Sequence, residues 1–127
     1  MAEKPFEALR GRRFLVVDDD YAIANDIARW LEDAGAEVVG PAGTVEDALE
    51  LVESEAFPLD GAALDINLHG ETVYPVADAL AARGVPFVFA TGYDADVIPE
   101  AYAGVPRCEK PVDRAQLARA LAKSAAR

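Results

Sequence analysis

The stretch Arg13-Phe-Leu-Val-Val-Asp-Asp-Asp20 joins a short apolar run directly to three carboxylates. Its apolar residues, Phe14 to Val17, are typical of a fully buried strand. Adjacent carboxylates repel each other, so three of them at one strand end favour a cation there. The carboxyl ends of strands are where α/β sheets bind ligands, and oxygen-only ligands suit Mg²⁺. The alternative, equally open on this stretch alone, is an acidic loop with Asp20 as the N-cap of the next helix.

Further apolar runs and helical spacings follow in regular alternation. The expected strands cover residues 13–18, 37–41, 59–64, 86–90 and 105–109, and the expected helices cover residues 20–34, 44–55, 73–83, 94–103 and 113–126. Of these helices, 94–103 contains Pro99 and is expected to be short or mobile. Five strand–helix alternations with short connections predict a doubly wound α/β fold, in which a five-stranded parallel sheet carries helices on both faces.

The composition restricts the organisation and the partners of the chain. Its 127 residues fit one domain, which we place at residues 13–126 after a short polar lead-in at residues 1–12. Lys and Arg number 12 against 23 Asp and Glu, a net charge of −11, which argues against nucleic acid or an anionic membrane as a partner. No apolar run is long enough to cross a bilayer and no signal peptide is apparent, so we expect a cytoplasmic protein. The single cysteine, Cys108, excludes an internal disulfide and is expected to be structural.

Chemically useful side chains follow four of the five expected strands. The first strand is followed by Asp18 and Asp19, the third by Asp65, the fourth by Thr91 and the fifth by Lys110. In a doubly wound sheet these strand ends meet at one edge, near the topological switch point. Three acids, a hydroxyl and an amine form a coherent set for phosphoryl transfer, in which a carboxylate can attack phosphorus while Mg²⁺ and a lysine neutralise the phosphoryl oxygens.

Together these motifs resemble the receiver domain of two-component response regulators, over essentially residues 13 to 126. The resemblance implies a flavodoxin-like sheet of strand order 2-1-3-4-5 with five helices. It also implies that Asp65 accepts a phosphoryl group from a phosphohistidine. Mg²⁺ would be held by Asp19, Asp65 and the backbone carbonyl of Asn67, with Asp18 acting through water.

The same resemblance assigns the residues around the phosphoryl group. Thr91 would bind the acyl phosphate and shift toward it on activation, and Gly92 would leave the pocket open on that side. Lys110 would pair with the phosphoryl oxygens, and its peptide bond to Pro111 is often cis in the family.

A subfamily signature is also visible. Phe89-Ala-Thr-Gly-Tyr93 resembles the motif of the FATGUY receivers of alphaproteobacteria. Many of these are paired with HWE or HisKA2-type kinases, so the implied phosphodonor is such a sensor histidine kinase or a histidine phosphotransferase.

One position departs from the usual receiver pattern. Receivers commonly carry an aromatic residue three positions before the lysine, and here that position is Arg107. We therefore hypothesise that the weak segment 94–103, with Tyr93 and Tyr102, carries the conformational signal. The alternative is that both tyrosines merely pack. His69, four residues after Asp65, is interpreted as an exposed loop residue, with control of access or dephosphorylation as the alternative.

The main interpretation is a stand-alone receiver that is not an enzyme acting on an external substrate. We expect no output domain of its own, because little chain follows the last helix. It would bind an unknown downstream protein or serve as a phosphate sink, as a monomer or weak dimer. A competing reading is a small phosphatase of the haloacid dehalogenase type that uses Asp18, but the further acidic pair which that family needs is missing. A third is a receiver-like adaptor that works without phosphorylation.

Overall fold

The computed structural model describes residues 4–54, 58–92 and 98–125 of the chain. Its main sheet has five parallel strands in the order β2-β1-β3-β6-β7. These strands are β1 (Arg13–Val17), β2 (Glu37–Ala42), β3 (Gly61–Asp65), β6 (Phe87–Thr91) and β7 (Arg107–Glu109). The predicted parallel sheet and its strand order, 2-1-3-4-5 when only these five strands are counted, are confirmed.

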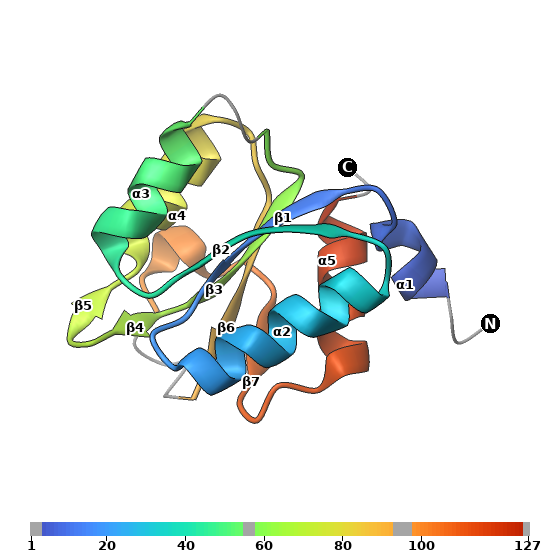
Figure 1. Ribbon diagram of the computed structural model, residues 1–127. Helices are drawn as coiled ribbons and strands as arrows, with labels where there is room; N and C mark the ends of the chain where they lie inside the picture. The colour runs from blue at the N-terminus through green and yellow to red at the C-terminus, as the bar shows by residue number, and fades with distance from the viewer. Residues whose placement is uncertain (1–3, 55–57, 93–97, 126–127) are drawn as a thin grey trace.

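Helices cover both faces of this sheet (Figure 1). On one face lie α2 (Tyr21–Asp33), α5 (Arg114–Ala125) and α1 (Lys4–Leu9), and on the other lie α3 (Val45–Glu53) and α4 (Tyr74–Ala82). The continuous apolar run of β1 serves both layers, because Phe14 and Val16 belong to one hydrophobic core while Leu15 and Val17 belong to the other. A strand buried on both faces needs no polar alternation.

Side-chain caps fix where three helices begin. Asp20 Oδ1 accepts hydrogen bonds from the backbone N–H groups of Ala22 and Ile23, at 3.0 and 3.3 Å. Thr44 caps α3 in the same way, and Asp113 accepts from the N–H of Gln116 in the first turn of α5. Asp20 is therefore an N-cap, as one reading of the acidic stretch predicted, and this leaves Asp18 and Asp19 for the site.

The first twelve residues are more than the polar lead-in that the sequence suggested. Residues Lys4–Leu9 form α1, which packs against α5, and the side chain of Leu9 is only 1% exposed. The expectation is corrected because Leu9 finds an apolar partner far away in the chain, which local polarity does not reveal. The domain boundary at residue 12 stays a prediction.

Two further segments differ from expectation. The loop after Asp65 contains a small antiparallel hairpin of β4 (Asn67–Leu68) and β5 (Glu71–Thr72). Within the expected helix 94–103, the described part forms only the short 3₁₀ helix η2 (Glu100–Tyr102), which follows Pro99. Proline lacks the N–H that a longer helix would need at this point.

The remaining sequence expectations concern the cysteine and the membrane. Cys108 is buried and free, as predicted. Among the described residues no helix is long and apolar enough to cross a membrane.

Candidate functional site

The carboxyl edge of the sheet gathers the acids that the sequence pointed to. Asp18 and Asp19 directly follow β1, and Asp65 is the last residue of β3, the strand beside it. One carboxylate oxygen from each of the three lies within 4.8 Å of the others. The structure therefore brings the three predicted acids together.

Lys110, which directly follows the edge strand β7, also reaches this cluster. Its Nζ lies 3.1 Å from Asp18 Oδ2 and 3.2 Å from Asp65 Oδ2, and its side chain is only 17% exposed. The backbone N–H of Lys110 donates to the carbonyl of Thr91, so β7 and β6 end side by side. Thr91 itself is buried, and Lys110–Pro111 is a cis peptide bond, as the family resemblance implied.

The electrostatics of the cluster are dominated by its excess of negative charge. Burial, with the neighbouring Asp18 and Asp19 carboxylates, raises the pKa of Asp65 to about 6, although Lys110 opposes the shift. Burial lowers the pKa of Lys110, but its contacts with Asp18 and Asp65 outweigh burial and raise that pKa overall. One ammonium thus faces three carboxylates, an imbalance that a bound cation would relieve.

Asp18 lies deepest in the cluster and is 1% exposed. Its Oδ1 accepts a hydrogen bond of 2.9 Å from the backbone N–H of Asp20. Its Oδ2 lies 3.1 Å from the Lys110 ammonium and has no other partner among the described residues. A buried carboxylate oxygen left in this way suits a bound cation or a water attached to one.

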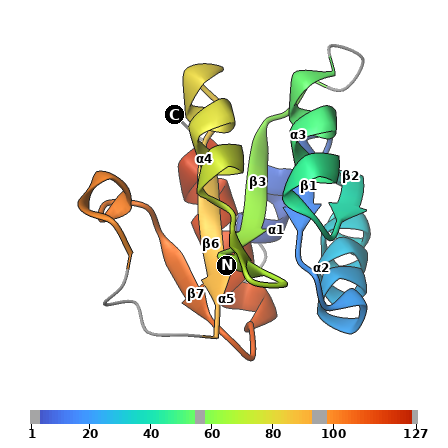
Figure 2. The same cartoon turned by 90° about the vertical axis from the view of Figure 1, so that its left-hand side faces the viewer.

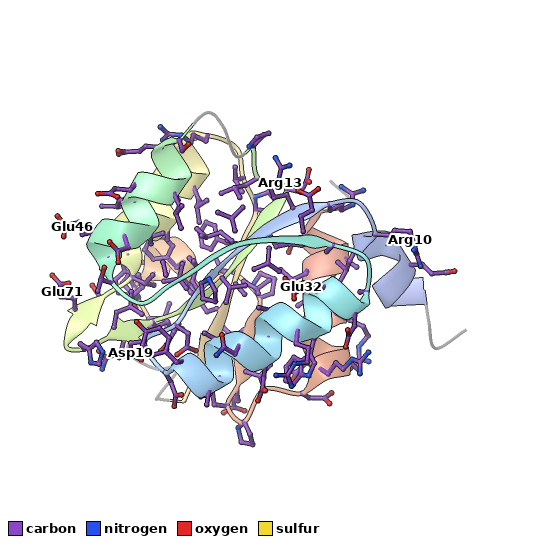
Figure 3. The ribbon with its side chains drawn as sticks, viewed as in Figure 1. Arg10, Arg13, Asp19, Glu32, Glu46 and Glu71 are labelled. Atoms are coloured by element: carbon purple, nitrogen blue, oxygen red, sulfur yellow. The ribbon has the colours of Figure 1, made fainter. Side chains whose placement is uncertain are left out.

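Asp19 connects the cluster to the β4–β5 hairpin. Its Oδ2 accepts a 2.8 Å hydrogen bond from the backbone N–H of His69. Figure 3 shows Asp19 close to the hairpin that carries Glu71. His69 adopts a positive φ of 52°, and Asn67 Oδ1 accepts from the N–H of Gly70, which closes the turn. The side chain of His69 is exposed, as predicted, but its backbone contact with Asp19 was not foreseen from the sequence.

These residues line a cavity of about 300 Å³ at the carboxyl edge. Its lining residues are Asp19, Asp20, Asp65, Asn67, His69, Gly70, Gly92 and Lys110. A Cβ added to Gly92 would lie 3.7 Å from the Lys110 side chain, an ordinary contact, so glycine is not sterically required there. A larger cavity of about 580 Å³ lies at the opposite edge of the sheet, beside Arg12 and Asp60, away from the acidic cluster.

Tyr102 and Arg107, which the sequence analysis connected with a conformational switch, do not line the cavity at the carboxyl edge. Tyr93 falls outside the described residues. Tyr102 lies on η2 and packs against α4, and Arg107 is exposed on β7 opposite Phe89 of β6. The sequence reasoning missed the α4 partners of Tyr102, which are Tyr74 and Asp78. Their spacing of four residues, which places both on one helix face, was the available signal.

Comparison with known proteins identifies similar structures. No protein-family model and no curated protein sequence matches the chain. SdrG from Sphingomonas melonis Fr1 is 41% identical, with a TM-score of 0.76 over 91% of this chain and 95% of that one. A CheY-like response regulator receiver domain protein from Methanospirillum hungatei JF-1 is 28% identical, with a TM-score of 0.79 over 91% and 94% of the two chains.

A third similar structure belongs to a longer protein. The response regulator PhyR from Brucella abortus is 24% identical, with a TM-score of 0.78, and supports the fold alone. The match covers 96% of this chain but only 51% of PhyR, so this chain spans about half the length of that protein. From its sheet order, its acidic edge and these likenesses over nearly its full length, the chain belongs to the response regulator receiver domains, the signal-transduction modules of two-component systems.

Proposed function

We propose that this receiver accepts a phosphoryl group from a phosphohistidine on the carboxylate of Asp65. One observation carries the proposal: Asp65 opens into the cavity at the carboxyl edge while Lys110 Nζ lies 3.2 Å from its Oδ2. A largely buried carboxylate that lines a cavity beside an ammonium is a nucleophile with a partner for the incoming negative charge.

The chain's own residues would act as follows. A carboxylate oxygen of Asp65 attacks phosphorus, and the P–N bond to the donor imidazole breaks. The electron pair leaves with the imidazole, which then takes a proton. Lys110 neutralises charge on the phosphoryl oxygens, and the hydroxyl of Thr91, at the end of the neighbouring strand β6, donates a hydrogen bond to them.

The donor set fits Mg²⁺. Three clustered carboxylates are balanced by one lysine, and the buried Asp18 Oδ2 has only that lysine as a partner among the described residues. Both features favour a hard cation with oxygen ligands. Asp19, Asp65 and the backbone carbonyl of Asn67 would hold it directly, and Asp18 through water. When bound, the ion supplies positive charge to the phosphoryl oxygens.

A relative supports phosphoryl chemistry at this site. SdrG has also been solved in a BeF₃-activated conformation, in a structure 40% identical to this chain with a TM-score of 0.71. Beryllofluoride mimics a phosphoryl group on a carboxylate.

From the sequence resemblance we also propose that the chain is a cytoplasmic FATGUY-type receiver. Its phosphodonor would be a HWE or HisKA2-type kinase or a histidine phosphotransferase. It would signal by protein contacts or drain phosphoryl groups, as a monomer or weak dimer, without turning over an external substrate.

Intact mass spectrometry with phosphoramidate, a small P–N donor, and Mg²⁺ tests the proposal. Wild type and the control Asp26→Asn, altered at an exposed position on α2, should each gain one phosphoryl group. Asp65→Asn should gain none. A gain that survives Asp65→Asn but disappears in Asp18→Asn would favour the phosphatase instead. No gain from phosphoramidate or from a phosphorylated histidine phosphotransferase would favour the adaptor.

A further inference from the structure

The segment between β6 and β7 is fastened to α4 through one aromatic side chain. The ring of Tyr102, on η2, stacks on the ring of Tyr74 with centroids 5.1 Å apart and planes within 9° of parallel. Figure 1 shows η2, in orange, beside α4, and Figure 2 shows the same turn standing away from β7. Tyr102 therefore ties this turn to α4, beside the packing of Ile98 and Val105 against the same core.

A hydrogen bond to the same helix accompanies the stacking of the two rings. The hydroxyl of Tyr102 donates to Asp78 Oδ1, and its oxygen also lies 3.5 Å from the carbonyl of Tyr74. Tyr74 and Asp78 are one helical turn apart on α4, so a single helix face offers both a ring for stacking and a carboxylate. Burial and the Asp78 carboxylate raise the pKa of Tyr102 to about 12, so the hydroxyl keeps its proton at neutral pH.

The Tyr102 ring also rests on the strand that leads to the proposed phosphoryl site. It meets Phe89 edge-on at 6.0 Å and Phe87 at 6.5 Å, and both of these residues belong to β6. Ala90, the next residue of β6, pairs in register with Asp65, and Thr91 follows it. Phe89, which lies under Tyr102, is thus directly adjacent to the β6 position that pairs with the acceptor.

The edge strand β7 contributes no aromatic ring opposite Phe89. Opposite Phe89, β7 presents Arg107, whose side chain is exposed, instead of a buried aromatic ring. Among the described residues, the rings that contact Phe89 are those of Phe87 on its own strand and of Tyr74 and Tyr102. Among the described residues, Tyr102 is the one aromatic side chain on the β6–β7 connection that touches β6.

We propose that Tyr102 is a latch between η2 and α4 that is closed in the unmodified protein and is released when Asp65 carries a phosphoryl group. The proposal rests on the proposed function of Asp65. Displacement of Thr91 toward a phosphoryl group would move β6 at Phe89 and disturb the surface on which Tyr102 lies. Release would detach η2 from Asp78 and uncover the aromatic face of Tyr74. The structure shows the closed arrangement, and the released arrangement would lack both the stack and the hydrogen bond, which gives the two discrete arrangements that such coupling requires.

Two conservative variants weaken the latch from opposite sides. Tyr102→Phe keeps the stacked ring but removes the hydroxyl, and Asp78→Asn removes the charged acceptor at an exposed position, so neither threatens the core. If the closed latch opposes activation, each variant should bind beryllofluoride in the presence of Mg²⁺ more tightly, by roughly fivefold. The double variant should gain no more than either single variant, because both remove the same bond. Tyr21→Phe and Asp47→Asn, both at exposed positions, are matched controls and should bind as wild type does.

A direct readout of the ring completes the experiment. In protein labelled with 3-fluorotyrosine, the ¹⁹F resonance of Tyr102, assigned with Tyr102→Phe, should move when beryllofluoride and Mg²⁺ are added and stay unchanged in Asp65→Asn. Unchanged affinities, additive effects in the double variant, or an unmoved Tyr102 resonance in wild type that binds beryllofluoride would each overturn the latch. Wild type that takes up neither beryllofluoride nor a phosphoryl group would instead overturn the proposed function, so the two failures are distinguishable.

Discussion

The ammonium of Lys110 lies 3.2 Å from a carboxylate oxygen of Asp65, although the strands that carry these residues are not neighbours. Lys110 follows the edge strand β7, and Asp65 ends β3, with β6 between them. The ion pair therefore spans β6 and joins the edge strand to the centre of the sheet. Since both side chains are largely buried, the pair matters for stability as well as for chemistry.

Replacement of Lys110 by Met should destabilise the metal-free protein. Among the described residues, the change removes the one ammonium that contacts the buried Asp18 and Asp65, and an uncompensated buried charge costs about 3–5 kcal/mol. Urea denaturation in the presence of EDTA measures the free energy of unfolding. Lys123→Met, at an exposed position on α5, is the control. Equal unfolding free energies for the two variants would contradict the role given to Lys110.

The raised pKa of Asp65 predicts an unusual pH dependence. Its folded-state pKa, about 6, lies above the ordinary value of 3.8, so the fold favours the protonated form. The stability contributed by this group is therefore fully present below pH 3.8 and is lost as the pH rises through about 6. Without metal, Asp65→Asn should accordingly unfold with a free energy higher than wild type by about 1–2 kcal/mol at weakly alkaline pH.

Two further observations check that account of Asp65. The advantage of Asp65→Asn should disappear in acid, where wild-type Asp65 is protonated, and Asp26→Asn should show no such crossover. Millimolar Mg²⁺ should raise the melting temperature of wild type more than that of Asp65→Asn, because the variant loses one of the proposed ligands. An advantage that persists unchanged at acidic pH would mean that the charge of Asp65 is not its origin.

The N-terminal helix makes a separate prediction about stability. Leu9 is 1% exposed and belongs to the core that α2 and α5 share, so Leu9→Ala should cost about 2–4 kcal/mol. Glu7→Ala, on the same helix but exposed, should change the unfolding free energy little. Thermal denaturation of both variants provides the comparison. Because Leu9 lies far from the acidic edge, phosphoryl uptake by Leu9→Ala below its melting temperature should match wild type.

Alkaline titration tests the environment of Tyr102. Its pKa of about 12 lies above the ordinary value of 10.0, since burial and the Asp78 carboxylate both oppose ionisation. The stability contributed by this group is present below pH 10 and is lost as the pH rises toward 12. Absorbance of tyrosinate should therefore show that Tyr102→Phe removes a late-titrating group. A variant that lacks an early-titrating tyrosine instead would refute this environment.

The fold followed from local patterns that are strong in this chain. The apolar strand Phe14 to Val17 and the capping residues Asp20 and Thr44 fixed strand and helix positions that the structure confirms. The sequence also predicted that the acids lie close together, because the carboxyl ends of parallel strands meet at one edge of the sheet.

What the sequence did not reveal depends on contacts between distant segments. The α1 helix is anchored by the burial of Leu9 against α5, and the two-residue strands β4 and β5 are too short to show a period. The stack of Tyr102 on Tyr74 joins η2 to α4, and a helical pattern defines which face a residue occupies without defining its partner.

Cys108 gives the receiver a chemical probe of its own motion. It is the only cysteine, it lies in the centre of β7, and it is buried in the core that contains Leu117 and Leu121 of α5. Burial, together with the nearby Asp113, raises the pKa of its thiol. While β7 is packed against α5, the thiol is therefore buried and protonated and does not react. The rate at which a thiol reagent labels the native protein therefore reports how often the edge strand separates from α5, and it does so without a substitution anywhere in the chain.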